Sequence, residues 1–145
     1  MTGRRAVLVG GVVVAVLAAV VAPWSYRAAH RAPADCDTAH ALIAYNTEFA
    51  GRMKASTAPD KAGAVTPDQY REWAARVRDY AGQISNPELS GKANTAAELA
   101  GRLADLVPRY RAKPDDAATA RDYAGLGIEF GNAINRLEYA CPGVG

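Results

Sequence analysis

The sequence predicts an all-α protein, with one N-terminal transmembrane helix followed by an up-down-up-down antiparallel four-helix bundle closed by one disulfide. One observation is a long apolar run early in the chain. Another is that apolar residues recur at spacings of three and four in four later segments, while no segment alternates with period two. The last is that Cys36 and Cys141 bracket those four segments and are the only cysteines among the 145 residues.

The apolar run covers residues 6–22 without a charge or a hydrogen-bonding side chain. As a helix it would span about 25 Å, which is the short end of a membrane crossing but longer than the apolar core of a typical signal peptide. Pro23 stops such a helix at the membrane edge, and Trp24 and Tyr26 suit the interface. We therefore expect a cytoplasmic tail and transmembrane signal-anchor helix in residues 1–26, a juxtamembrane linker in 27–35 and a domain in 36–142.

A secreted form is the alternative, because Ala32-Pro33-Ala34 has the small-x-small form of a cleavage site. Either way, a disulfide persists in an oxidising compartment, so we expect a cytoplasmic N-terminus and an extracytoplasmic domain at the cell membrane. Small residues on one face of the apolar run favour helix pairing in lipid, and hence a homo-oligomer. They are Gly11, Ala15, Ala18 and Ala22.

Start signals divide the domain into helices expected at about 37–56, 67–85, 87–111 and 115–140. Thr66-Pro67-Asp68 and Asn86-Pro87-Glu88 each supply an N-cap, a proline at the first helical position and an acid in the first turn. Pro114 precedes Asp115 and Asp116, which we expect in the first turn of the last helix. We expect Pro108 to bend the third helix or end its regular part.

The apolar spacing gives each helix an expected core face. In the first helix this face holds Cys36, Ala39, Ile43, Asn46, Ala50 and Met53, with Leu42 and Phe49 beside it. In the second it holds Tyr70, Trp73, Val77, Tyr80 and Ile84; in the third Ala96, Leu99, Leu103, Leu106 and Tyr110. In the fourth it holds Ala120, Tyr123, Gly127, Phe130, Ile134, Leu137 and Cys141.

An up-down-up-down bundle brings the start of the first helix to the end of the fourth, where Cys36 and Cys141 can join. That bond predicts neighbouring pairs along the two helices: Ala39 with Leu137, Ile43 with Ile134, Asn46 with Phe130, and Ala50 with Gly127. Ala124, Gly127 and Gly131 form a flat stripe. We expect it to admit a neighbouring helix inside the bundle, the alternative being an outward docking face.

The sequence lacks the residues that several kinds of binding and catalysis require. The first 34 residues hold four arginines and no acid, leaving 13 basic and 15 acidic side chains, so nucleic acid is not an expected partner. His30 and His40 are the only histidines, and His30 lies in the linker, so no catalytic triad has an obvious base in the domain. We expect no enzyme activity, no cofactor and no metal, because two lone extracytoplasmic cysteines pair with each other.

Three residues remain as possible ligand or register positions: Asn46, Tyr45 and Tyr123. A buried asparagine on a helix-packing face often fixes register and less often holds a ligand. Tyr45 and Tyr123 are candidates for lining a pocket. In composition and layout the domain resembles the haemophore-type haem-binding proteins, a resemblance that implies an exported helical haem carrier; their pattern pairs a tyrosine with a nearby downstream histidine, and Tyr45 has none after it.

These observations predict a membrane-anchored extracytoplasmic helical domain that acts as an interaction or scaffolding module in the cell envelope, with a protein partner there. The alternative is an exported helical binding protein for haem, lipid or another apolar ligand, held between the aromatic faces of the second and fourth helices.

Overall fold

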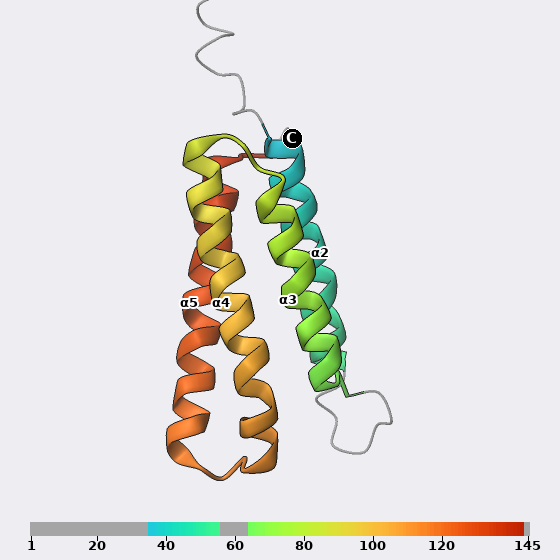
Figure 1. The fold of residues 1–145 in the computed structure, drawn as a ribbon, viewed down its shortest axis with the longest axis vertical. Coiled ribbons are helices and arrows are strands. Elements are labelled where there is room, and N and C mark those ends of the chain that lie inside the picture. Colours follow the sequence, from blue (N-terminus) through green and yellow to red (C-terminus); the bar gives the residue numbers. More distant parts are fainter. Residues whose placement is uncertain (1–34, 56–63, 144–145) are drawn as a thin grey trace, which may run out of the picture. The chain divides into compact units, whose positions relative to one another are not determined.

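The computed structural model describes residues 35–55 and 64–143. This part of the chain contains four α-helices and no strand: α2 (Cys36–Ala55), α3 (Pro67–Gly82), α4 (Pro87–Ala112) and α5 (Ala117–Ala140). The helices alternate in direction and lie side by side as an up-down-up-down bundle (Figure 1). The predicted all-α four-helix bundle is therefore confirmed.

The predicted transmembrane helix and linker lie outside the described residues, apart from Asp35. None of the helices α2 to α5 combines the length and the apolar character that a membrane crossing requires. The membrane anchor stays a prediction from the sequence.

The helix starts are set by the predicted signals. Thr66 caps α3 in a capping box, in which its hydroxyl accepts from Gln69 N and the Gln69 side chain accepts from Thr66 N at 2.7 Å. Asn86 caps α4 by accepting from Glu88 N and Leu89 N, and Pro87 occupies the first helical position. Asp116 caps α5. Each cap satisfies backbone N–H groups that have no partner within the helix.

Some predicted boundaries shift by a few residues. α3 ends at Gly82 and not near residue 85. α4 continues through Pro108 to Ala112, so the proline does not end the helix. Pro108 removes one backbone hydrogen bond close to the end of the helix, where the last carbonyl groups have no partner within the helix in any case. The free-energy cost of the proline is therefore lower there than in the middle of a helix.

The predicted disulfide is confirmed. Cys36 Sγ and Cys141 Sγ are 2.07 Å apart, and the two Cα atoms are 5.4 Å apart. Both cysteines are buried. Beside them His40 Nε2 donates a hydrogen bond of 2.8 Å to the Cys141 carbonyl. The start of α2 and the end of α5 are thus joined by a covalent bond and a hydrogen bond.

Asp35 forms a second clamp at this end, which the sequence did not reveal. Its Oδ2 accepts from Ser85 N (2.7 Å), Ser85 Oγ (2.9 Å) and Asn86 N (2.8 Å), in the connection between α3 and α4. Asp35 has a φ of 73°, in the left-handed region that Asp and Asn tolerate better than most residues. The three donors, with Asn86 N contributing most, lower the pKa of the Asp35 carboxyl.

This clamp predicts a loss of stability in acid. Because the folded pKa of Asp35 lies below the ordinary value of about 3.9, the unfolded chain binds the proton more tightly. The contribution is therefore fully present above about pH 5 and is lost as the pH falls through 4 and then through the lower folded pKa. The same sign holds for Asp116, whose pKa is lowered by the Thr119 hydroxyl and then by Thr119 N.

Asp35→Asn keeps an acceptor and a residue tolerant of positive φ, but it cannot titrate. We expect it to flatten the dependence of the unfolding free energy on pH between 5 and 3, measured by urea denaturation. Asp35→Ala should lose stability at neutral pH as well. An unchanged pH dependence in Asp35→Asn would show that the clamp carboxylate does not contribute.

α4 supplies the largest share of the core. Ten of its residues are buried, half of them alanines, and it packs extensively against both α3 and α5. Small side chains at such a contact let helix axes approach closely. The predicted core faces of α3 and α4 are largely confirmed, since Tyr70, Trp73 and Val77 are buried on α3; Ala96, Leu99, Leu103 and Leu106 are buried on α4.

The predicted core face of α2 is partly wrong. Its buried side chains are Cys36, Ala39, Leu42 and Phe49. Ile43, Asn46, Ala50 and Met53 are only half-buried. The buried stripe is turned toward Leu42 and Phe49 because α2 packs more on α3 than on α5. The side of α2 that should have closed against α5 is left facing a groove.

Candidate functional site

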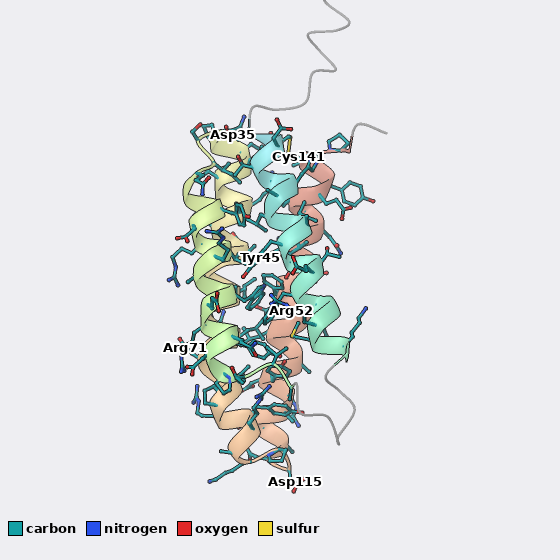
Figure 2. All side chains as sticks on the ribbon, turned by 90° about the vertical axis from the view of Figure 1, so that its right-hand side faces the viewer. Asp35, Tyr45, Arg52, Arg71, Asp115 and Cys141 are labelled. Carbon is teal, nitrogen blue, oxygen red and sulfur yellow. A yellow bond between two sulfur atoms is a disulfide. The ribbon has the colours of Figure 1, made fainter. Side chains whose placement is uncertain are left out.

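The groove runs between α2 and α5 and has a volume of about 370 Å³. Figure 2 views the bundle from the side where α2 lies in front, with α3 and α5 flanking it. Buried side chains from α3 and α4 form the floor of the groove, and half-buried or exposed residues of α2 and α5 form its two walls. The lining residues are Asn46, Ala50, Met53, Tyr70, Trp73, Leu103, Tyr123, Ala124, Gly127, Phe130, Gly131, Ile134 and Asn135.

An aromatic cluster makes the floor rigid. Trp73 stacks on Phe49 with ring centroids 4.9 Å apart and meets the Phe130 ring edge-on at 5.1 Å. Tyr70 contacts Phe49 edge-on at 5.3 Å. Offset-stacked and edge-to-face pairs of this kind contribute about 0.5 to 1.5 kcal/mol each beyond the area they bury. The floor is therefore a preformed apolar surface, in which Phe49 of α2 and Phe130 of α5 hold the Tyr70 and Trp73 rings of α3 in place.

A chain of hydroxyl contacts marks one end of the groove. The Tyr70 hydroxyl donates to Met53 Sδ at 2.9 Å and lies 3.1 Å from the Tyr123 hydroxyl, which then donates to Tyr70. The Tyr123 ring stacks on Tyr110 at 4.7 Å. Burial, followed by the hydrogen bond to Tyr123, raises the pKa of the Tyr70 hydroxyl. Tyr70 is thus a neutral hydrogen-bonding group at physiological pH.

Two polar groups in the groove lack partners. Trp73 is 2% exposed, and its indole N–H has no hydrogen-bond acceptor in residues 35–55 and 64–143. Asn46 is half-buried, and its side-chain amide makes no hydrogen bond within the described part of the chain. A buried donor without an acceptor costs about 1 to 3 kcal/mol. Because the Trp73 indole nitrogen is itself buried, the folded protein bears this cost.

The α5 wall is flat and open. A Cβ atom placed on Gly127 or Gly131 would meet nothing within 4 Å, and Gly127 is exposed. The expectation that this glycine stripe admits α2 inside the bundle is therefore wrong. The predicted neighbours Asn46 and Phe130, and Ala50 and Gly127, all line this groove.

The three predicted site residues are divided between two places. Asn46 and Tyr123 both line the groove. Tyr45 lies on the other side of α2, beside α3, where its ring is 6.0 Å from that of Tyr80 and borders a small charged hollow. Sequence reasoning did not single out Trp73 and Phe130 as site residues, because their spacing indicated only core packing.

His40 and the two cysteines do not offer a thiolate metal site. Their sulfur atoms are bonded to each other, and His40 is engaged with the Cys141 carbonyl. No cluster of three metal-ligating side chains occurs among the residues that the structure describes.

Comparison with other proteins leaves the groove to be interpreted from its own geometry. Neither the protein-family models, the curated proteins nor the solved structures gave a match to this chain.

Proposed function

We propose that this protein is an extracytoplasmic binding domain for an uncharged apolar ligand, which it holds in the groove between α2 and α5. The observation that carries the proposal is a groove of about 370 Å³ with an aromatic floor and no acidic or basic residue in its lining. Small-molecule sites are typically concave, about 300 to 1,000 Å³ in volume, mostly apolar and fitted with a few polar groups; in helical bundles they lie between helices.

The proposal includes a membrane anchor. The apolar residues 6–22 support a single crossing, and the disulfide supports an oxidising compartment for the domain. The N-terminus would then be cytoplasmic and the bundle extracytoplasmic. Pairing through Gly11, Ala15, Ala18 and Ala22 would place two such domains side by side.

Filling the groove tests the function. Gly127→Leu places a side chain in the open space of the α5 wall, where a Cβ meets nothing within 4 Å. Gly125→Leu is the matched control, since its Cβ also meets nothing within 4 Å, yet it points about 200° away around the helix. Both changes remove a glycine from a helix interior, so neither should destabilise the fold.

Native mass spectrometry of the full chain, extracted with its surrounding lipids, gives the readout. We expect one retained small molecule in the natural protein and in Gly125→Leu, and its loss in Gly127→Leu. Lipids that coat residues 6–22 would be common to all three proteins. Identical bound species in all three would overturn the proposal.

An interaction or scaffolding module is the second candidate, favoured by exposed apolar side chains on α5. Ile128 is 68% exposed and Tyr139 is 90% exposed. A photo-crosslinking amino acid at Ile128 should then capture a defined envelope protein in cells, whereas one at the exposed Asp79 of α3 should not. Equal capture from both positions, or none, would count against this candidate.

A further inference from the structure

We infer that the exposed face of α5 binds the same face of a second copy of this protein, with the two α5 helices antiparallel across a two-fold axis. The exposed apolar side chains of this face, the small residues that would lie opposite them and the charges along one edge each support the pairing. The inference goes beyond the ligand groove and does not depend on a ligand.

The outer face of α5 carries apolar side chains and no charge. Ile128 and Tyr139 are the large apolar side chains that are exposed in residues 35–55 and 64–143, at 68% and 90%. At 3.6 residues per turn they share one face, which is uncharged for about 22 Å of helix. Its residues, all at least partly exposed, are Ala124, Ile128, Gly131, Asn132, Asn135 and Tyr139. Protein interfaces are likewise depleted in charge at their centre and enriched in aromatic residues.

An antiparallel pair places large side chains opposite small or polar ones. With the two-fold axis between positions 131 and 132, each residue faces the residue at the same distance on the other side of the axis. Tyr139 then lies opposite Ala124 of the second copy. Ile128 lies opposite Asn135 of the second copy. The tyrosine ring can therefore pack over a short side chain at each end of the contact, as ridges pack into grooves between helices.

The edge of this face next to α4 is complementary to itself in charge. Glu129 and Arg136 are both exposed and lie two turns apart on that edge, where Arg136 borders a hollow lined by α4 residues. Neither forms an ion pair within the described part of the chain. A two-fold axis perpendicular to antiparallel helices brings the same edge of both copies together. Glu129 then lies within one helical turn of Arg136 of the second copy, and the symmetry repeats the pair.

A parallel pair fits these side chains less well. It places each residue opposite its own counterpart, so that Tyr139 meets Tyr139 and Arg121, which continues the face toward the start of α5, meets Arg121. It also brings the α4 edge of one copy to the opposite edge of the other, which separates Glu129 from Arg136. The charges therefore favour the antiparallel order.

The contact is small, so we expect weak pairing. A strip about 22 Å long and one helix wide, about 10 Å, is smaller than a standard interface, which buries about 800 Å² on each partner. Confinement of two chains to one membrane by residues 6–22 would supply the high effective concentration that a weak contact needs, a step that rests on the proposed anchor. Two copies in one membrane are related by an axis perpendicular to it, so the paired α5 helices would lie along the membrane surface.

Cysteine crosslinking in membranes of cells that express the full chain tests the pairing and its direction. A short bismaleimide joins the engineered thiols, and the two natural cysteines stay out of the reaction because they are bonded to each other. We expect Asn132→Cys, next to the axis, to crosslink to itself. Ala124→Cys and Glu138→Cys should each give no dimer alone, because equal positions lie about 20 Å apart along the helices. The same two variants should crosslink to each other when they are coexpressed.

Charge reversal tests the α4 edge. Added to Asn132→Cys, Glu129→Arg should reduce the crosslinked dimer by about fivefold, because both attractive contacts become repulsive. Arg136→Glu should have the same effect, and Glu129→Arg combined with Arg136→Glu should restore the dimer. Asp79→Arg, the same change of charge at an exposed position of α3, is the matched control and should leave the dimer unchanged.

Other results overturn the inference in distinguishable ways. A dimer of Ala124→Cys alone would show that the two helices pair in parallel. A product in which Asn132→Cys is joined to a different protein would assign this face to that partner. Absence of any dimer, or a double charge reversal that does not restore it, would mean that α5 does not pair as argued. None of these results changes the ligand loss expected in Gly127→Leu, so the proposed function and the pairing fail separately.

Discussion

Cys141→Ser should lower the unfolding free energy by about 2 to 4.7 kcal/mol, the range that loop-closure entropy gives for bonds closing long loops. Here the bond joins residues separated by 105 positions. For a domain of this size, such a loss corresponds to a drop in melting temperature of at least about 10 °C. Thermal unfolding followed by circular dichroism measures it, and reduction of the natural protein should reproduce it.

The loss should be felt unevenly, because α2 packs more weakly on each of the other helices than α3 and α5 pack on α4. With the disulfide removed, α2 would be held at its start mainly by the Asp35 clamp and the His40 hydrogen bond to the Cys141 carbonyl. We expect amide hydrogen exchange to rise more in α2 than in α4. A uniform rise, or a melting temperature within about 2 °C of the natural protein, would contradict this account of the bond.

Trp73→Ala should be the most damaging substitution in the aromatic floor, with a cost of about 3 to 5 kcal/mol. Trp73 is 2% exposed and contacts the Phe49, Tyr70 and Phe130 rings. Its removal would leave a cavity that opens into the groove. The ring contacts that link α2, α3 and α5 would also be lost. Urea denaturation of the full chain gives the difference directly.

Trp73→Phe separates packing from hydrogen bonding. The indole N–H has no acceptor among the described residues, so its loss should not reduce stability, and only the smaller ring volume should cost free energy. We expect a cost well below that of Trp73→Ala. If Trp73→Phe and Trp73→Ala are equally destabilised, the indole N–H donates a stabilising hydrogen bond in the folded protein, contrary to this expectation.

Much of the fold could be predicted from the sequence because its signals are local or covalent. Thr66 and Asn86 each cap a helix as their positions indicate, and Asp116, expected in the first turn of the last helix, caps that helix instead. The pairing of Cys36 with Cys141 follows from there being two cysteines, and it agrees with the alternating helix directions. Core faces on α3 and α4 could be predicted because their apolar side chains are large or numerous.

The open groove could not be predicted, since it depends on how two helices turn relative to each other. Spacing placed both Leu42 and Asn46 near the core face of α2, and only tertiary packing decided that Leu42 and Phe49 would be buried. Gly127 is equally compatible with a close helix contact and with open space. The Asp35 clamp joins residues 50 positions apart through one carboxylate, and no pattern in the chain indicates it.

The proposed function requires an open groove between α2 and α5, and the accessibility of position 127 tests whether that groove is open. In Gly127→Cys, measured in the full chain with its disulfide closed and without bilayer, we expect maleimide to react about as fast as in Gly125→Cys and far faster than at the buried position in Ala133→Cys. Adding methyl dodecanoate should slow the reaction at position 127 and leave position 125 unchanged. A thiol at 127 that is as protected as one at 133 before any addition would mean that α2 closes against α5 and that there is no groove to fill.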